Sequence, residues 1–414
     1  MIGKRVVVTG LAAVTPIGND LGESWSNLVA GVSGAAPITR FDTTGFDTTF
    51  ACEVKSFDEK AYIPHKQSRR MAIFTRFAVA CGMMLLENAG YTIPEAEASR
   101  VGVIVGCGLG GLEDLEAFHS KLLEQGPGRI SPFFIPMIIA NMAAGQISIF
   151  TGAKGPGLCT TSACASGLHA IGYAYTDILL GRADVMICGG AESTITPLAV
   201  AGFNSLKALS TRNDDPKTAS RPFDKDRDGF VIGEGSGLVL LESLEHATAR
   251  GATILAEVAG FGASLDAFHM TAPPESGEGM ALAMSAALRE AGLAPAEVAH
   301  INAHGTSTYL NDACETTAIK TVFGEHAYTV PITSNKSMIG HTLGAGGGIE
   351  SVMSVKTIAE GIIPPTINLV TPDPACDLDY CPGVARRAEV SSVLCNSFGF
   401  GGANACVVFK KFEE

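Results

Sequence analysis

One cysteine stands in a setting that could make it a nucleophile. Cys164 lies in the run Thr161-Ser162-Ala163-Cys164-Ala165-Ser166-Gly167, directly before a helix-like stretch at 167–181. Backbone N–H groups and the helix dipole at a helix N-terminus favour thiolate over thiol, so we expect the pKa of Cys164 to fall below its ordinary value of about 8.5. The sequence has 11 cysteines, and we expect the others to be small apolar fillers of the core.

Two histidines far downstream could serve this thiol. His304 lies in the run Asn302-Ala303-His304-Gly305-Thr306-Ser307-Thr308, and His341 ends the run Lys336-Ser337-Met338-Ile339-Gly340-His341. Apolar strand-like runs at 298–301 and 330–333 lead into them, and strand ends are where α/β proteins place their chemistry. Either histidine alone would suit a core or a turn. One thiol with two histidines indicates acyl transfer.

Alternating strand-like and helix-like segments must position these side chains. Short, apolar, glycine-bounded runs predict buried strands at 6–10, 101–106, 185–190 and 237–242. Apolar residues at helical spacing predict helices at 68–89, 112–125, 279–291 and 312–323. This alternation indicates an α/β fold, and we see neither a linker between independent modules nor a direct sequence repeat.

Composition fits a large enzyme of the cell interior. The chain has 414 residues, of which 46% are hydrophobic, enough for a sizeable core in two lobes or a duplicated domain. The net charge of −13 argues against nucleic acid as a partner. The cysteines form no Cys-x-x-Cys pair and no secretory signal is visible, which predicts a cytoplasmic protein. The apolar stretch 133–150 is interrupted by Pro136, Asn141 and Gln146, so we expect it to pack in the core or at an interface rather than insert in a membrane.

Several separated motifs together resemble one enzyme family. Besides the runs around Cys164, His304 and His341, they are Arg5-Val6-Val7-Val8-Thr9-Gly10, Ser210-Thr211-Arg212-Asn213-Asp214, Arg221-Pro222-Phe223-Asp224, Asp228-Gly229-Phe230-Val231 and Asn396-Ser397-Phe398-Gly399-Phe400-Gly401-Gly402. Over essentially its whole length the chain resembles the β-ketoacyl-acyl carrier protein synthases, of the synthase II type. The resemblance implies a thiolase-like α/β fold of two similar βαβ halves in α-β-α-β-α layers. We assign residues 1–253, with the cysteine, to one half and residues 254–414, with both histidines, to the other.

The resemblance also implies a cofactor-free and metal-free condensation. Cys164 would attack an acyl thioester, with the backbone N–H groups of Cys164 and Phe400 stabilising the oxyanion. Neutral His304 and His341 would then stabilise the enolate formed when malonyl carrier protein loses carbon dioxide. Lys336, partnered by Glu350, would support both histidines electrostatically. Phe400, together with Phe398, would gate the acylated cysteine.

Other residues match the family's substrate-binding positions. Leu109 would limit the length of the acyl chain. The pantetheine arm would be bound by Thr271, Thr306 and Thr308. An acidic acyl carrier protein would dock on a basic patch comprising Lys66, Arg69, Arg70, Arg129 and Lys207. The family further implies a homodimer.

Four alternatives stay open. The run Gly106-Cys107-Gly108-Leu109-Gly110-Gly111 matches a dinucleotide-binding pattern, but no second short strand ending in an acidic residue follows it. A polyketide ketosynthase would share the catalytic residues. A thiolase would use a second cysteine, for which Cys395 and Cys406 are candidates, and a non-catalytic chain-length partner would need no thiol at all. The preferred acyl length stays open as well.

Overall fold

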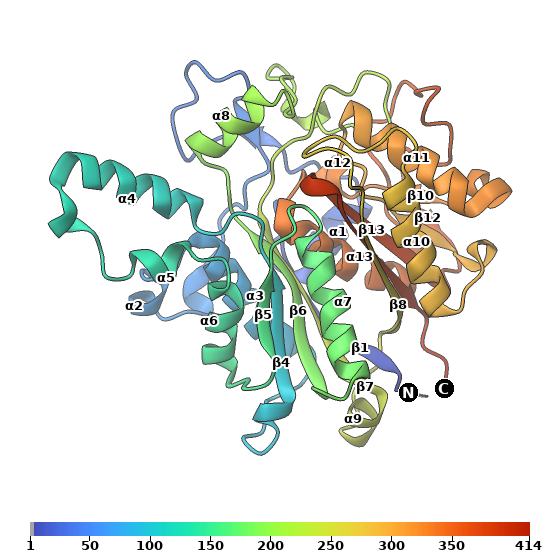
Figure 1. Ribbon diagram of the computed structural model, residues 1–414, viewed down its shortest axis with the longest axis horizontal. Coiled ribbons are helices and arrows are strands. Elements are labelled where there is room, and N and C mark those ends of the chain that lie inside the picture. The colour runs from blue at the N-terminus through green and yellow to red at the C-terminus, as the bar shows by residue number, and fades with distance from the viewer. Residues whose placement is uncertain (1–3) are drawn as a thin grey trace.

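A ten-stranded sheet forms the centre of the molecule (Figure 1). The structure is a computed structural model and describes residues 4–414. In sheet order the strands are β10 (Ile332–Thr333), β9 (His300–Asn302), β13 (Ser392–Gly399), β14 (Ala403–Lys410), β8 (Ala256–Leu265), β1 (Val6–Val14), β7 (Gly235–Ser243), β6 (Val185–Glu192), β4 (Val101–Gly106) and β5 (Gly157–Thr160). Two short pairs lie apart from it: β2 (Ala36–Pro37) with β3 (Phe50–Ala51), and β11 (Ile362–Ile363) with β12 (Arg386–Arg387).

The sheet consists of two halves with the same strand order. In the first half β1 pairs antiparallel with β7, β7 antiparallel with β6, and then β6, β4 and β5 are parallel. In the second half β8, β14, β13, β9 and β10 repeat this pattern in the same order. The halves join where β1 pairs with β8, with Val6 opposite Val258. The expected pair of similar halves is therefore present, although no repeat is visible in the sequence. The predicted boundary between residues 253 and 254 stays a prediction.

Helices lie in three layers around the two halves of the sheet. The α-helices are α1 (Leu21–Val29), α2 (His65–Ser68), α3 (Ile73–Asn88), α4 (Leu112–Gln125), α5 (Phe134–Ile138), α6 (Met142–Thr151), α7 (Ser166–Leu179), α8 (Pro197–Ser205), α9 (Leu244–Ala249), α10 (Glu278–Ala291), α11 (Tyr309–Phe323), α12 (Lys336–Ile339) and α13 (Gly346–Glu360). Helices α7 and α13 pack against each other and contact both halves of the sheet. Helix α3 covers the outer face of the first half and α10 that of the second. The layers are α-β-α-β-α, as a thiolase-like fold requires.

Four strands of the first half, β1, β4, β6 and β7, are buried on both faces, which explains their continuous apolar sequences. Along β7, Leu238 and Leu240 point to the outer layer and pack with residues of α3 such as Leu85. Val239 and Leu241 alternate with them and pack with residues of the central helices. One strand therefore contributes to two cores, because successive side chains of a strand point to opposite faces.

Most predicted elements are present, and one helix is divided. The predicted strands correspond to β1, β4, β6 and β7, and three of the predicted helices to α4, α10 and α11. The prediction of one helix over 68–89 is wrong, because Ala72 has an extended backbone with ψ of 160° and α3 starts anew at Ile73. The apolar stretch 133–150 forms α5 and α6. Within residues 4–414, every helix is too short or too polar to cross a lipid bilayer.

Candidate active site

Cys164 lies in a tight turn between β5 and α7. Ala163 has a left-handed backbone with φ of 51°, a costly conformation for a residue other than glycine. The turn is held by the Ser166 hydroxyl, which accepts a hydrogen bond from the Ser162 N–H at 2.9 Å and donates to the Ala163 carbonyl at 2.6 Å. These contacts fix the direction of the Cys164 side chain, which is 8% exposed.

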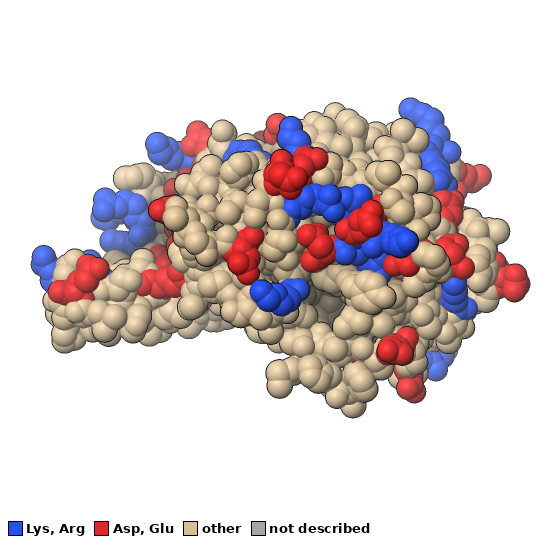
Figure 2. All heavy atoms as spheres, turned by 90° about the horizontal axis from the view of Figure 1, so that it is seen from above, with Lys and Arg blue, Asp and Glu red and all other residues tan. Residues whose placement is uncertain are grey.

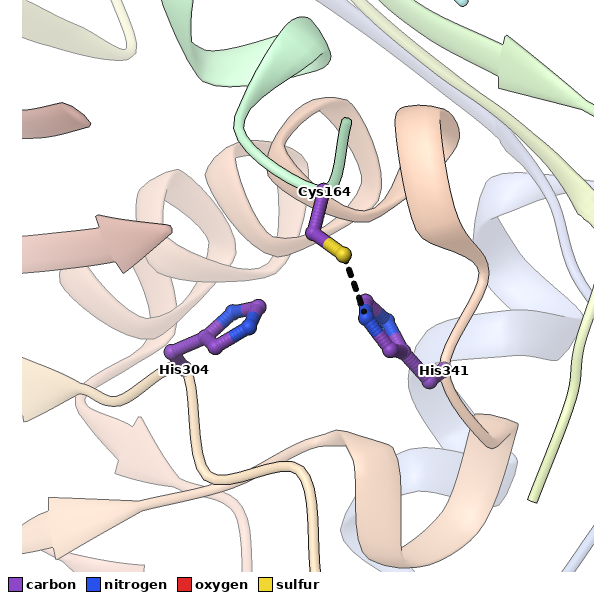
Figure 3. A group of neighbouring side chains, drawn as sticks. All are labelled: Cys164, His304 and His341. Carbon is purple, nitrogen blue, oxygen red and sulfur yellow. Dashed lines mark hydrogen bonds between the residues drawn. The ribbon is translucent and has the colours of Figure 1, made fainter. Parts of the chain in front are cut away.

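The structure brings Cys164, His304 and His341 together (Figure 3). His341 Nε2 lies 3.0 Å from Cys164 Sγ, and His304 approaches the sulphur from the other side. The two imidazole rings are nearly perpendicular, with centroids 5.3 Å apart. A soft metal ion could be ligated by one sulphur and two nitrogens within 4.8 Å of one another, but the ammonium of Lys336 would oppose a second positive charge here.

The expected lowering of the Cys164 pKa is wrong. Burial raises the pKa of Cys164 to about 11, although the Lys336 charge and the backbone N–H groups of Phe400 and Cys164 lower it in part. Helix α7 starts at Ser166, two residues after the cysteine, and the sulphur is removed from water. Loss of hydration therefore outweighs the favourable end of the helix, and the resting side chain is a thiol.

Both histidines are neutral in this environment. Burial and the Lys336 charge place the pKa of each imidazole well below 6.5. The Leu343 N–H points to His341 Nδ1 at 3.4 Å, so Nδ1 is the acceptor nitrogen. The proton of neutral His341 then resides on Nε2, the nitrogen that faces the sulphur. His341 can therefore donate a hydrogen bond into the site without carrying a charge.

Two residues that sequence reasoning missed hold the histidines in place. Phe230 packs edge-on against His341, with ring centroids 5.2 Å apart. Glu315 on α11 accepts hydrogen bonds from the His304 and Gly305 N–H groups at 2.9 and 2.8 Å, and burial raises the pKa of this carboxyl to about 7. Phe230 stands in one of the motifs that carry the family resemblance, whereas no sequence pattern pointed to Glu315.

Lys336 and Glu350 form a buried ion pair beside the histidines. Each side chain is 1% exposed. Burial raises the pKa of Glu350 and the Lys336 charge partly lowers it again. Lys336 stands at the start of α12 and Glu350 in the first turns of α13, so the pair links the two helices on either side of His341. The predicted partnership is thus present in the structure.

A pocket with a volume of about 600 Å³ leads from the surface to Cys164. It is lined by many of the residues singled out from the sequence: Leu109, Cys164, Lys207, Thr271, His304, Thr306, Thr308, His341, Phe398 and Phe400. Leu109 is 50% and Phe400 38% exposed, while Phe398 is buried and packs edge-on against His304. The Thr306 and Thr308 hydroxyls are 2.8 Å apart.

The remaining predicted residues lie away from this pocket. Lys66, Arg69, Arg70 and Arg129 are exposed on α2, the turn after it, and the short helix η3 (Pro127–Arg129). The Arg70 guanidinium lies 4.4 Å from the centre of the Phe133 ring, so the turn after α2 contacts the start of α5. The candidate thiolase cysteines, Cys395 and Cys406, are buried in β13 and β14, and neither lines the pocket.

Comparison with known proteins identifies the family of this chain. Residues 3–247 match the family model "Beta-ketoacyl synthase, N-terminal domain" and residues 255–370 the model "Beta-ketoacyl synthase, C-terminal domain". The chain belongs to the β-ketoacyl synthase family. This β-ketoacyl synthase is therefore a condensing enzyme of the acyltransferase class.

The relatives of this β-ketoacyl synthase match it end to end. It is 53% identical over 410 residues to a 3-oxoacyl-[acyl-carrier-protein] synthase 2 of Synechocystis, covering 99% of both chains. It is 49% identical over 413 residues to the protein of that name from Vibrio cholerae, covering 99% of this chain and 100% of the relative. Among solved structures, a β-ketoacyl synthase from Burkholderia phymatum superposes with a TM-score of 0.93 at 40% identity, covering 99% of this chain and 100% of the other.

Proposed function

We propose that this β-ketoacyl synthase is an elongating ketosynthase of the synthase II type, which condenses an acyl group with malonyl carrier protein. The observation that carries the proposal is the geometry around one sulphur. His341 Nε2 lies 3.0 Å from it, His304 lies opposite, and the N–H groups of Phe400 and Cys164 point to it. The sequence identity of 53% and 49% to two synthase 2 proteins over the whole chain supports the synthase II type.

The first half-reaction transfers an acyl group to Cys164. The sulphur attacks the thioester carbonyl, and the proton of the thiol leaves with the pantetheine thiol that is released. The Phe400 and Cys164 N–H groups, which point to the sulphur in the resting site, donate to the oxyanion as it forms. The Lys336 charge favours the thiolate character that attack requires, since it lowers the pKa of Cys164 against the effect of burial.

The second half-reaction is a decarboxylation followed by carbon–carbon bond formation. Malonyl carrier protein loses carbon dioxide, and the electron pair of the broken bond moves onto the thioester as an enolate. Neutral His304 and His341 donate hydrogen bonds to the enolate oxygen. The carbanion attacks the acyl carbonyl, the carbon–sulphur bond to Cys164 breaks, and the thiolate that leaves takes up a proton from solvent. The product is a β-ketoacyl carrier protein two carbons longer, and the cycle needs no cofactor.

Residues along the pocket would control which acyl chain reacts. Leu109 would limit chain length at the wall, and Phe400 would gate the acyl cysteine with support from Phe398. Phe400 is partly exposed, and the two residues after it, Gly401 and Gly402, have φ of 81° and 72°. Glycines in such conformations give the segment backbone freedom that other residues lack.

We propose that the acyl carrier protein approaches the open end of this pocket. Thr271, Thr306 and Thr308 line it where a pantetheine arm would pass. Figure 2 looks onto the molecule from above and shows basic side chains on the left, above the projecting arm that α4 and α5 form, and a second basic group beside a hollow in the middle. Lys207 lines the mouth of the pocket, whereas Lys66, Arg69, Arg70 and Arg129 gather at the arm. Such separated basic groups could contact an acidic partner at two places.

We also propose that the enzyme is a cytoplasmic homodimer. The arm formed by α4 and α5 projects away from the body (Figure 1), and large apolar side chains are exposed along it and on the nearby α6. Leu123 is 74%, Ile135 57% and Ile149 70% exposed. Strand β5 ends the sheet on this side, so a second copy could extend the sheet and cover these side chains. The free cysteines suit a reducing compartment.

The test is intact-mass analysis after mixing the enzyme with acyl carrier proteins of graded chain length, followed by malonyl carrier protein. We expect an acyl adduct on Cys164 that converts to a β-ketoacyl carrier protein two carbons longer. Cys164→Ala should abolish the adduct, whereas His304→Ala should spare some acylation and block decarboxylation. Equal loss of both steps in His304→Ala would contradict this division of roles.

A polyketide ketosynthase is the second candidate. A structure described as "The ishigamide ketosynthase/chain length factor" superposes with a TM-score of 0.93 at 37% identity, over 99% of this chain and 100% of the other. Another neighbour, at 35% identity, is a type II polyketide ketosynthase in complex with its acyl-carrier protein. The higher identity to synthase 2 proteins favours fatty acid elongation. The chain-length profile of the adducts, and the presence or absence of a cysteine-less partner on co-purification, distinguish the two.

A further inference from the structure

Glu192 is a buried carboxylate that connects two loops of the pocket. It is the last residue of β6 and is 0% exposed. Its oxygens accept hydrogen bonds from the backbone N–H groups of Gly108 at 2.6 Å, Leu109 at 3.3 Å and Gly344 at 3.1 Å. The loop at 107–109 follows β4, and Gly344 follows His341. Within residues 4–414, no lysine, arginine or histidine lies within salt-bridge distance of this carboxylate, so backbone N–H groups provide most of its stabilisation.

The two loops approach each other so closely that both need glycine at the carboxylate. A Cβ atom on Gly108 would lie 2.7 Å from Glu192 Oε2. A Cβ atom on Gly344 would lie 2.6 Å from the same oxygen and 2.4 Å from the Gly108 nitrogen. The run at 106–111 matched a dinucleotide-binding pattern, whose backbone N–H groups bind an anion. Here those N–H groups bind an internal anion instead, the carboxylate of Glu192.

Each loop carries a residue that bears on the reaction. Leu109 and Leu343 both line the pocket that contains Cys164. Leu343 has a left-handed backbone with φ of 50°, and its N–H points to His341 Nδ1. The next residue, Gly344, is the one that Glu192 holds. The position of the acyl-pocket wall and the orientation of His341 therefore depend on the same carboxylate.

We infer that Glu192 is a positioning residue that couples the acyl-pocket wall at Leu109 to the orientation of His341. This inference rests on the proposed function. A chain long enough to displace Leu109 must strain the bonds at Gly108 and Leu109, and the strain passes through the carboxylate to Gly344 and Leu343. Acyl-chain length then affects the condensation step as well as the binding of the acyl group.

The test compares Glu192→Gln with wild type for short and long acyl carrier proteins, and measures acylation of Cys164 and condensation separately. The amide replaces one acceptor oxygen with an NH₂ group that faces backbone donors. Loss of one hydrogen bond to a charged acceptor corresponds to roughly a tenfold to hundredfold change. We expect the acylation rate for long chains, relative to short ones, to rise at least about tenfold as Leu109 is released. We expect kcat for condensation to fall by a similar factor at all lengths as His341 loses its orientation.

Two further variants make the result decisive. Glu53→Gln is the matched control, because Glu53 is also buried and accepts hydrogen bonds from the Thr39 N–H and hydroxyl, away from the pocket. It should keep the wild-type length profile. If Glu192→Gln does not fold, Glu192→Asp serves instead, since it keeps the charge but is too short to reach both loops. An unchanged length profile with equal losses in both steps would overturn the inference. Failure of the wild-type enzyme to elongate any acyl carrier protein would instead overturn the proposed function.

Discussion

The buried pair of Lys336 and Glu350 allows stability and catalysis to be separated. Lys336→Met removes the ammonium and leaves Glu350 buried without its partner. Breaking a buried ion pair from one side costs about 3–5 kcal/mol of unfolding free energy, because an uncompensated charge stays in the interior. The double variant Lys336→Met/Glu350→Met replaces both partners with apolar side chains of similar size. We expect it to recover stability to within about 1–2 kcal/mol of wild type.

The cost of Lys336→Met should depend on pH in a defined direction. In wild type, the pKa of Glu350 already lies above 4.5, because burial raises it more than Lys336 lowers it. Without Lys336 this pKa rises further. Below the wild-type pKa the carboxyl is protonated in both proteins, so this contribution is absent at low pH. Above it the variant loses stability relative to wild type by up to about 1.4 kcal/mol per pH unit, until the variant's own pKa is reached.

Denaturant unfolding at several pH values, combined with the acylation assay, tests this reasoning. The double variant should be stable but slow, since Lys336 no longer lowers the pKa of Cys164. Each further unit of rise in that pKa reduces the thiolate fraction about tenfold. If the losses of unfolding free energy in Lys336→Met and in Glu350→Met simply add in the double variant, the two residues do not act as a pair. A double variant with wild-type acylation would show that the Lys336 charge has no part in activating the thiol.

Substitution of three other buried side chains should have measurable effects on stability or on the reaction. Phe230→Ala should lower the free energy of unfolding by about 3–5 kcal/mol, since Phe230 is 4% exposed. It should also slow decarboxylation more than acylation, because His341 loses the ring packed against it. Denaturant unfolding measures the first effect and carbon dioxide release the second. Arg227→Ala should raise KM for carrier-bound substrates, because this buried guanidinium donates hydrogen bonds to the Thr308 and Tyr309 carbonyls at the pocket. Arg227→Lys should restore only part of the wild-type KM. An unchanged KM in Arg227→Ala would show that these hydrogen bonds do not shape the binding site. Burial would raise the pKa of Glu242, but hydrogen bonds from Arg250, His246 and Thr9 lower it to about 2. The free energy of unfolding should therefore fall by about 3 kcal/mol as the pH falls from about 5 to 2. Denaturant unfolding at each pH should show that this part of the acid dependence is absent in Glu242→Gln.

The sequence predicted those features that depend on local pattern. Strands β4 and β6 were evident because each is a short apolar run that is buried on both faces. Cys164, His304 and His341 were identified by their motifs, and the structure brings them together. The family resemblance added the pairing of Lys336 with Glu350, which no spacing rule would give.

Features that depend on remote segments could not be predicted. Glu192 accepts hydrogen bonds from backbone N–H groups of two loops that are far away along the chain. Glu315 accepts them from His304 and Gly305, which precede its helix. The sequence around either glutamate gives no sign of these partners. The predicted direction of the Cys164 pKa shift is wrong because a helix N-terminus can be recognised in the sequence, whereas the burial of the sulphur cannot. The break before α3 depends on the backbone of Ala72, a residue with no preference for ending a helix.

Helices α7 and α13 meet in the middle layer, between the two halves of the sheet. Helix α7 follows the nucleophile and α13 follows His341, so the two equivalent helices of the duplicated fold present one reactive group each. They approach so closely that a Cβ atom on Gly347 would lie 2.4 Å from the Leu168 nitrogen, and one on Gly167 2.8 Å from the Gly348 nitrogen. Neither half of the chain holds a complete reaction centre. Condensation therefore reports directly whether the two halves have docked, and a nascent chain cannot carry out this reaction until its last strands are in place.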